Sequence, residues 1–254
     1  MTRVTTLGQR LGDLTTNELA ARLAAGPVIA LVPVGSTEPH GPHLPLSTDA
    51  RISEAVAHRA AERLAQEGQD ALVCPEIPYG VTDFAEGFAG AISIPAEVLV
   101  GFLRAVGTGL LAQGFSDVCF INNHLEPAHD TAVRAAAKLV GPRASVACPL
   151  TRKWARTLTD EFKSGACHAG QYETSLVQAI DERLVRPAGR ELPALALSLS
   201  DGIKAGQTTF QAIGMTDAYT GTPARASASE GHDSLHRLTD MVVAEIAEAR
   251  RARA

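Results

Sequence analysis

The feature that most constrains the fold is a short apolar run from Val28 to Val34 (VIALVPV), which is uncharged and rich in β-branched residues. Such a run is typical of a strand buried on both faces of a sheet. Similar runs follow at 71–74, 117–122 and 145–148. Amphipathic helical patterns separate them, and this alternation predicts an α/β fold with a mostly parallel sheet.

Helical patterns fill the stretches between these runs. Thr15 and Glu18 fit a capping box that opens a first helix, which we expect to end near Ala25. A long loop at 75–95 is expected to lead into a helix opened by Pro95. The other expected segments are helices from about 49, at 129–139, 152–162 and 173–180 and from about 226, extended chain at 193–199, and irregular chain at 201–226. Because the sequence has no repeat and no break in composition, we expect one three-layer α/β/α domain over residues 1–254.

Composition excludes several classes of protein. The net charge is −5 and the one basic cluster, 250–253, closes the chain, so nucleic acid is not an expected partner. The N-terminus, Met1–Thr6, lacks the apolar stretch of a signal peptide, and no apolar run approaches membrane-spanning length. The four cysteines are widely spaced, which argues against a disulfide framework. We therefore expect a cytoplasmic protein with no membrane partner.

Polar side chains gather in the segments that follow the predicted strands. Glu38 and His40 lie just after the first strand, and Asp49 ends the same Gly- and Pro-rich loop. His124 and Glu126 come directly after the third strand. Because ligands of parallel sheets collect beyond the carboxyl ends of the strands, we expect these side chains to meet at one edge.

A third polar segment, 166–175, follows the fourth strand and contains His168 and Glu173. Carboxylates and imidazoles together suit zinc, manganese or iron. Six such donors exceed the needs of one open catalytic zinc and suit two metals that share a carboxylate: Glu38, His40, Asp49, His124, Glu126 and Glu173. Simpler interpretations stay open for single members, since Asp49 could be a helix cap and Glu173 a first-turn carboxylate favoured by its helix dipole.

The same motifs resemble a known family. The stretch 35–49 (GSTEPHGPHLPLSTD) resembles the signature loop of the creatininase (creatinine amidohydrolase) family, Gly-x-x-Glu-x-His-Gly-x-His-Leu-Pro followed by an Asp. The stretches 123–126 and 168–175 are similar to its Asn-Gly-His and His-Ala-Gly-x-x-Glu-Thr-Ser blocks. Over about residues 10–185, the resemblance implies an α/β/α fold, a homo-oligomer that is often a hexamer, and two divalent metals, commonly zinc and manganese.

Carried over by position, the resemblance implies that the six donors are metal ligands, with Asp49 as the bridge. Donor chemistry suggests an oxygen-rich manganese site of Glu38, Asp49 and Glu126, and a zinc site of His40, Asp49, His124 and Glu173. His168 matches the family's proton-transferring histidine. Leu125 stands where the creatinine-cleaving branch has an aromatic residue, so the substrate stays open.

The expected reaction is hydrolysis by a water molecule that two metals activate, with His168 as the acid and base. The leading substrate is a small cyclic amide such as creatinine; the alternatives are a carbocyclic polyol ketone, a formyl group or a small peptide. Leu125, Tyr172, Trp154 and Asp83 are the candidate substrate-binding residues, although Trp154 could equally be a core or interface residue. A metal-binding protein without catalysis and a purely structural protein are the other classes considered.

Overall fold

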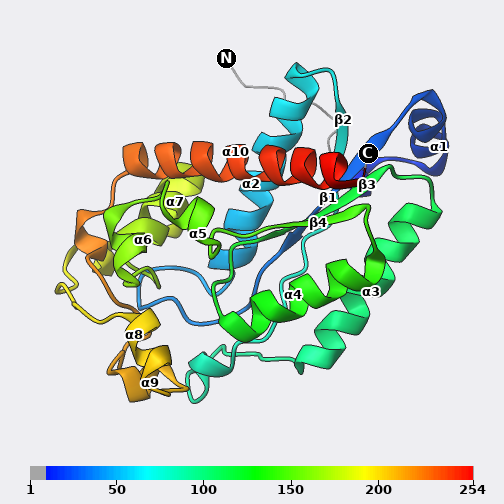
Figure 1. Cartoon of the computed structure of the whole chain (residues 1–254). Coiled ribbons are helices and arrows are strands. Elements are labelled where there is room, and N and C mark those ends of the chain that lie inside the picture. The colour runs from blue at the N-terminus through cyan, green and yellow to red at the C-terminus, as the bar shows by residue number, and fades with distance from the viewer. Residues whose placement is uncertain (1–9, 254) are drawn as a thin grey trace.

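The computed structural model describes residues 10–253, and it confirms the predicted parallel sheet between helices (Figure 1). Strands β1 (Val28–Val34), β2 (Asp70–Val73), β3 (Asp117–Asn122) and β4 (Ala144–Ala147) pair in the order β2-β1-β3-β4, and all neighbours are parallel. The predicted domain's residues 1–9 and 254, including the Met1–Thr6 stretch, lie outside the described residues.

Alternate residues of β1 belong to two different cores because successive side chains point to opposite faces of a strand. Ile29 and Leu31 pack in the core beneath α2 (Thr48–Gln66), α7 (Gln171–Asp181) and α10 (Ala228–Arg253). Val28, Ala30 and Val32 pack in the core covered by α1 (Thr16–Ala25), α3 (Ala96–Ala112) and α4 (Pro127–Val140). Figure 1 shows α10 above the sheet and α3 and α4 below it.

Two predictions about local structure need correction. The single helix expected at 152–162 is two short ones, α5 (Arg152–Ala155) and α6 (Asp160–Ser164), because Thr159 accepts a hydrogen bond from Phe162 N–H and starts a new helix. The stretch expected to be irregular, 201–226, includes the end of α8 (Leu199–Lys204) and all of α9 (Phe210–Ile213). Residue 195 of the stretch expected to be extended forms an isolated bridge with Gly221.

The carboxyl ends of β1 and β3 are held together by Ser53 of α2. Its hydroxyl donates to the carbonyl of Val34 (2.8 Å) and accepts hydrogen bonds from the backbone and side-chain N–H groups of Asn123 (3.1 Å each). The start of α2 also lies so close to Gly35 that a β-carbon there would stand 2.4 Å from the amide nitrogen of Ala50. These contacts fix the points where two functional loops leave the sheet.

The amino-terminal end of β3 is tied to the last helix. Arg250 Nη2 donates to Asp117 Oδ2 (2.6 Å), and Arg253 binds Asp117 Oδ1. Burial by itself would raise the pKa of Asp117, but these arginine hydrogen bonds outweigh burial and lower it. This cluster stands at the edge of the sheet opposite the functional loops, since β3 begins at Asp117 and ends at Asn122.

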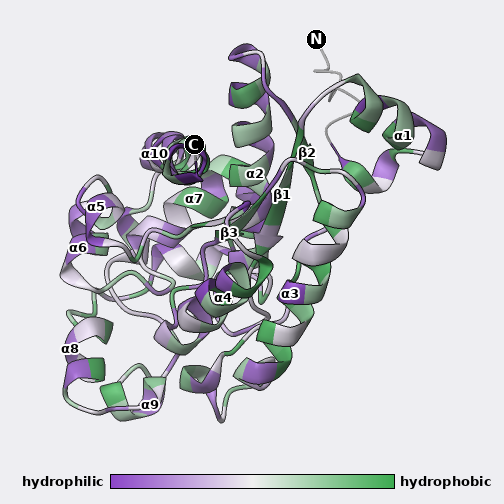
Figure 2. Cartoon of the chain, turned by 45° about the vertical axis from the view of Figure 1, so that its right-hand side comes forward, coloured by the Kyte–Doolittle hydropathy of each residue, from purple (hydrophilic) through white to green (hydrophobic). Residues whose placement is uncertain are grey.

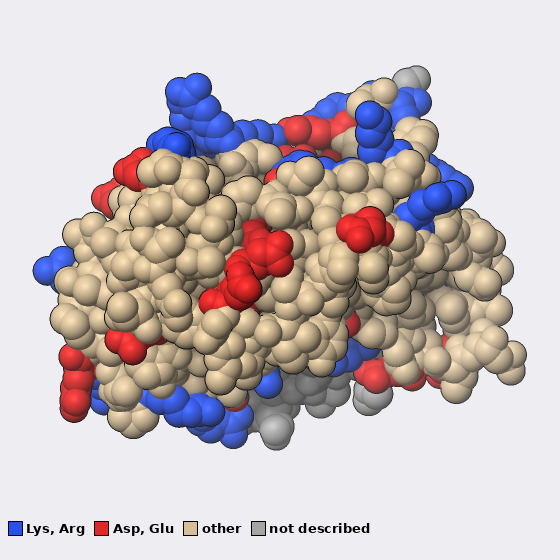
Figure 3. All heavy atoms as spheres, turned by 90° about the horizontal axis from the view of Figure 1, so that it is seen from below, with Lys and Arg blue, Asp and Glu red and all other residues tan. Residues whose placement is uncertain are grey.

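The surface is mixed in character. Figure 2 shows hydrophobic residues along the strands and hydrophilic residues on many outward helix turns. The underside in Figure 3 is mainly uncharged, with Lys and Arg mostly near its rim. Among the helices of residues 10–253, none combines the length and apolar character needed to cross a membrane.

Candidate metal centre

The structure brings seven of the predicted site residues together at the carboxyl edge of the sheet. They come from the loop after β1, the start of α2, the loop after β3 and the segment that leads into α7. Each is at most 6% exposed: Glu38, His40, Asp49, His124, Glu126, His168 and Glu173. Burial of so many ionisable groups in one place is costly unless they compensate one another or bind an ion.

Asp49 lies between two imidazoles. Its Oδ1 is 3.1 Å from His40 Nε2, and its Oδ2 is 3.1 Å from His124 Nδ1. The helix-cap interpretation of Asp49 is wrong, because Asp49 is the second residue of α2 and the N-cap position belongs to Ser47. The helix instead presents the carboxylate to the centre from its first turn.

Backbone carbonyls orient the three histidines. His40 Nδ1 lies 3.2 Å from the carbonyl of Glu38, His124 Nε2 lies 2.7 Å from that of Val81, and His168 Nε2 lies 3.0 Å from that of Pro39. An N–H that donates to the carbonyl leaves the other ring nitrogen as an acceptor. In each histidine that second nitrogen faces carboxylates of the centre, the arrangement expected of metal ligands and proton acceptors.

The carboxylates are held by donors from neighbouring segments. The Thr82 hydroxyl donates to Glu38 Oε2. The N–H groups of Asp83 and Phe84 donate to the two oxygens of Glu126 (3.1 and 3.3 Å). Ala169 N–H donates to Glu173 Oε2 (2.7 Å). The long loop after β2 therefore borders the centre, as its position after a strand predicts.

Ala169 adopts an uncommon conformation directly after His168. Its φ is +50°, in the left-handed region that residues with a β-carbon rarely occupy. This backbone turn points the amide of Ala169 at Glu173, within the segment that carries His168. Strain of this kind persists where surrounding structure fixes it, and it often accompanies functional sites.

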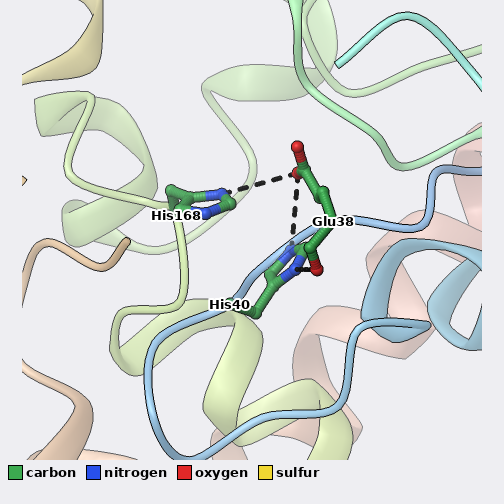
Figure 4. A group of neighbouring side chains, drawn as sticks. All are labelled: Glu38, His40 and His168. Atoms are coloured by element: carbon green, nitrogen blue, oxygen red, sulfur yellow. Dashed lines mark hydrogen bonds and ion pairs between the residues drawn. The ribbon is translucent and has the colours of Figure 1, made fainter. Parts of the chain in front are cut away.

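His168 stands beside both His40 and Glu38, as Figure 4 shows. Its ring centroid is 4.5 Å from that of His40, and its Nδ1 is 3.8 Å from Glu38 Oε1. On the other side the ring is 4.4 Å from that of Phe210 in α9. Burial, reinforced by the positive charge of His40, lowers the pKa of His168 to about 4, so its imidazole is neutral near pH 7.

The electrostatics of the centre call for added positive charge. Burial would lower the pKa of His40, but Asp49, Glu173 and Glu38 raise it to about 10. Burial raises the pKa of Glu126 to about 7, and it also raises that of Glu173. Four carboxylates thus share a buried space in which two imidazoles are drawn toward the charged form. A divalent cation would satisfy the same demand.

The donors fit such an ion. Asp49 Oδ2 is buried and accepts no hydrogen bond from the described residues, although it faces His124 Nδ1. Three sets of residues each bring their donor atoms, one per residue, within 4.8 Å of one another. The sets are Glu38, His124 and Glu126; His40, Asp49 and Glu173; and Glu38, His40 and His168. His124 thus groups with Glu38 and Glu126, whereas the division of ligands expected from donor chemistry placed it in the zinc site with His40. Each of the first two sets then contains an imidazole, so neither is purely oxygen-based.

A cavity of about 420 Å³ opens onto this centre. Its floor includes Glu38, Asp49, His124, Glu126, His168 and Glu173. Its walls are mainly apolar, and the larger side chains there are Phe84, Leu125, Leu150, Phe162, Ile203 and Phe210. A water-excluding wall beside a cluster of ionisable groups is the usual form of a small-molecule site.

Of the four candidate substrate-binding residues, Leu125 alone is among the described residues that line the cavity. Tyr172 is buried against Phe162, at 4.9 Å between ring centroids. The indole N–H of Trp154 donates to Glu245 of α10 (2.6 Å). Asp83 accepts a hydrogen bond from Ser93, and only its backbone N–H reaches the centre.

No role at the site is predicted for His129, which lies in the helix expected at 129–139, yet it packs against the centre. Its ring lies 4.6 Å from that of His124 and is fully buried. Its Nδ1 accepts from Val81 N–H (3.2 Å), and the carbonyl of Val81 contacts His124. A β-carbon at Gly80 would stand 2.3 Å from the His129 ring. The close spacing of His124 and His129 in sequence was the available signal.

Fold and centre together define a class: an α/β protein with a buried carboxylate–imidazole centre, suited to divalent metal, beneath an apolar cavity. Residues 12–248 match the family model described as creatinine amidohydrolase. The chain belongs to the creatininase family and is a metal-dependent hydrolase.

Similar proteins carry more than one activity. The chain is 35% identical over 246 residues to the mycofactocin precursor peptide peptidase of Mycobacterium ulcerans (strain Agy99), covering 93% of this chain and 91% of that protein. It is 32% identical over 121 residues to the creatinine amidohydrolase of Pseudomonas putida, 46% and 45% of the two chains. A solved structure described as "Creatininase Mn" has a TM-score of 0.73 at 23% identity, over 94% of this chain and 98% of the other.

Proposed function

We propose that this hydrolase cleaves an amide bond in a short peptide that carries apolar side chains, with two divalent metals at the centre. The cavity is the observation that carries this proposal. At about 420 Å³ it falls in the range of ~300–1,000 Å³ typical of sites for ligands of drug-like size. Its apolar walls would cover peptide side chains, whereas a small polar ring would leave them exposed to water.

The similarity to a peptide peptidase along nearly the whole chain supports the same choice. Opening of a cyclic amide stays a prediction and is the second candidate, because part of the chain is similar to a creatinine amidohydrolase. The homo-oligomer, the cytoplasmic location and the single domain also stay predictions.

The donor sets assign holding roles to this chain's side chains. Glu38, His124 and Glu126 would hold one ion, and His40 and Glu173 the other. Asp49 would contribute to both, since its two oxygens face different imidazoles. Bound divalent ions supply Lewis acidity, which polarises an amide carbonyl and makes a water molecule more acidic. Manganese and zinc both suit this mixture of oxygen and nitrogen donors.

His168 would move the proton. Its Nε2–H is engaged by the Pro39 carbonyl, which leaves Nδ1 free to accept a proton and to return it to the leaving nitrogen. Phe210 packs on one side of the ring and limits its access to solvent. The lowered pKa keeps the imidazole neutral, and therefore able to accept a proton, at neutral pH. Glu38, 3.8 Å away, would stabilise the imidazolium that forms.

The experiment that tests the function combines metal analysis with a substrate panel. The protein treated with chelator should hydrolyse nothing, and manganese or zinc should restore cleavage of short apolar peptides in preference to creatinine. Full activity without metal would exclude the mechanism. Cleavage of creatinine alone would favour the second candidate.

Substitution of His168 separates proton transfer from metal binding. His168→Asn should retain the metal content of the unaltered protein and lower kcat by ~10²–10⁴-fold, the usual contribution of a general acid and base. If His168→Asn instead loses one equivalent of metal, His168 is a ligand in the set with Glu38 and His40.

A further inference from the structure

Two cations stand on an otherwise uncharged wall of the cavity. Apart from the residues of the metal centre, Lys163 and Lys204 are the charged residues among the described residues that line it. The chain contains four lysines, so half of them lie at this cavity. No acidic residue among the described lining residues lies outside the centre, so the charged side chains that line the wall are both cationic, whereas the carboxylates line the floor.

The two lysines come from helices that are locked together. Lys163 belongs to α6 and Lys204 to α8, and Leu199 N–H at the start of α8 donates to the carbonyl of Gly165 at the end of α6 (2.8 Å). Gly165 has a φ of +79°, and a β-carbon there would stand 2.6 Å from Ser200 Oγ. A residue with a β-carbon at 165 would be strained, so Gly165 allows α6 and α8 to approach closely. We call the part of the wall that carries Lys163 and Lys204 the α6–α8 edge.

The present partners of both lysines are replaceable. Lys163 pairs with Asp160, and Lys204 pairs with Asp201, each at 2.9 Å within one helix turn. The side chains of both aspartates are mostly exposed to solvent. Exposed pairs of this kind contribute little, so a ligand anion can compete for the ammonium groups. A solvated pair of lysines is the simpler interpretation, but it does not account for their shared position at the cavity.

We propose that the α6–α8 edge binds the free C-terminal carboxylate of a peptide substrate. This inference rests on the proposed function and narrows it to a cut near the C-terminus. The four carboxylates of the centre would repel an anion from the floor, while Lys163 and Lys204 attract it to the wall. Apolar side chains between the two ends would pack against Phe162 and Ile203. The lysines at the wall and the carboxylates at the floor would thereby orient the peptide with its C-terminus at the α6–α8 edge.

The test uses matched peptides with the metal-loaded protein. An N-acetylated apolar tripeptide is offered with a free C-terminus, as its C-terminal amide, and as an amide that carries one aspartate side chain. The free acid should have a KM about tenfold below that of the amide, with a similar kcat, because a contact at the rim of a site aids binding rather than chemistry. The preference should fall as KCl is raised, since exposed charges are screened.

Variants locate the effect. Lys163→Met and Lys204→Met should each reduce the preference for the free acid, and the double variant should bring it close to one. The control is Lys138→Met, which removes an exposed lysine of α4 that is not among the lining residues and should change nothing. Metal content, measured for every variant, should stay constant.

The outcomes separate this inference from the function on which it rests. Equal KM values for acid and amide would overturn the carboxylate site and leave peptide hydrolysis intact. An equal preference for the aspartate peptide would overturn the assignment to the C-terminus. If no peptide is cleaved, the proposed function fails, and calorimetric titration of the acid and the amide into the same proteins still decides whether the lysines bind a carboxylate.

Discussion

The floor and the outer wall of the cavity are built in different ways. The floor side chains are anchored by backbone donors and acceptors from the neighbouring loops, such as Val81 for His124 and Ala169 for Glu173. The outer part of the wall, formed by Phe162, Lys163, Ile203, Lys204 and Phe210, comes from the short helices α6, α8 and α9, and the ion pair of Lys204 with Asp201 stays within its own helix. We therefore expect changes in the floor to alter the chemistry and changes in the outer wall to alter the choice of substrate.

The largest effect is expected on the floor. Asp49→Asn removes the charge that both imidazoles face and should lower kcat/KM by at least ~10³-fold, because metal ligands act as a unit. Metal analysis should show less than the full complement of bound ions. If this variant retained both metals and normal turnover, the most central floor residue would be dispensable, and the floor could not be the part of the cavity that determines the chemistry. Asp233→Asn, at an exposed position of α10 away from the cavity, is the matched control.

A smaller loss is expected one layer behind the floor. His129→Phe keeps the ring packed against His124 but removes the acceptor for Val81 N–H, and Val81 orients His124. Loss of an outer hydrogen bond of this type typically weakens metal affinity by ~10–100-fold. Competition with a chelating dye would measure it. His236→Phe, on the exposed part of α10, should leave the affinity unchanged, and equal affinities in both variants would remove His129 from the centre.

A still smaller effect is expected on the wall. Phe210→Ala widens the cavity beside His168 and should raise KM for apolar peptides by about tenfold. Burial of an aromatic side chain contributes roughly 1.5–3 kcal/mol, and part of that free energy belongs to the protein's own packing rather than to contact with the substrate. Metal content should not change. A loss of metal in this variant would show that Phe210 helps to hold the metal ligands in place, so that wall and floor would not be independent.

The same division explains what could be predicted from the sequence. The strand Val28–Val34 and the capping box at Thr15 were predicted to the residue, because buried apolar runs and caps are local signals. The grouping of the seven residues of the metal centre followed from a rule about strand ends. The helices α8 and α9 were missed because each is short and begins at a single capping side chain, Ser198 or Thr209. Helix α9 also depends on the packing of Phe210 with Ala85 and Met215.

Three of the four candidate substrate-binding residues are not among the described residues that line the cavity, for a physical reason. Tyr172 and Trp154 have flat side chains that could stack on a ring, but their neighbours decide what they contact. Tyr172 faces Phe162 in the core, and Trp154 is drawn to Glu245 on the distant helix α10. Similarly, His129 differs from the other helix histidines only in its closeness in sequence to His124, and its place at the centre depends on how α4 packs beneath the loop at Gly80.

The smallest effect on activity is expected at the opposite edge of the sheet. Asp117→Asn weakens the contacts to Arg250 and Arg253 and should lower the free energy of unfolding by ~1–2 kcal/mol, while kcat/KM stays unchanged.

The pKa of Asp117 is lower in the folded protein, so the unfolded chain binds the proton more readily at mildly acidic pH. The stabilisation is therefore fully present above the unfolded pKa, near 4, and is lost as the pH falls through the lower folded value. Urea unfolding of both proteins at pH 7 and at successively lower pH should show the difference shrinking with acidification. A difference that persists at low pH would mean that the asparagine disturbs packing rather than charge, and an altered kcat/KM would show that the two ends of the sheet are not independent.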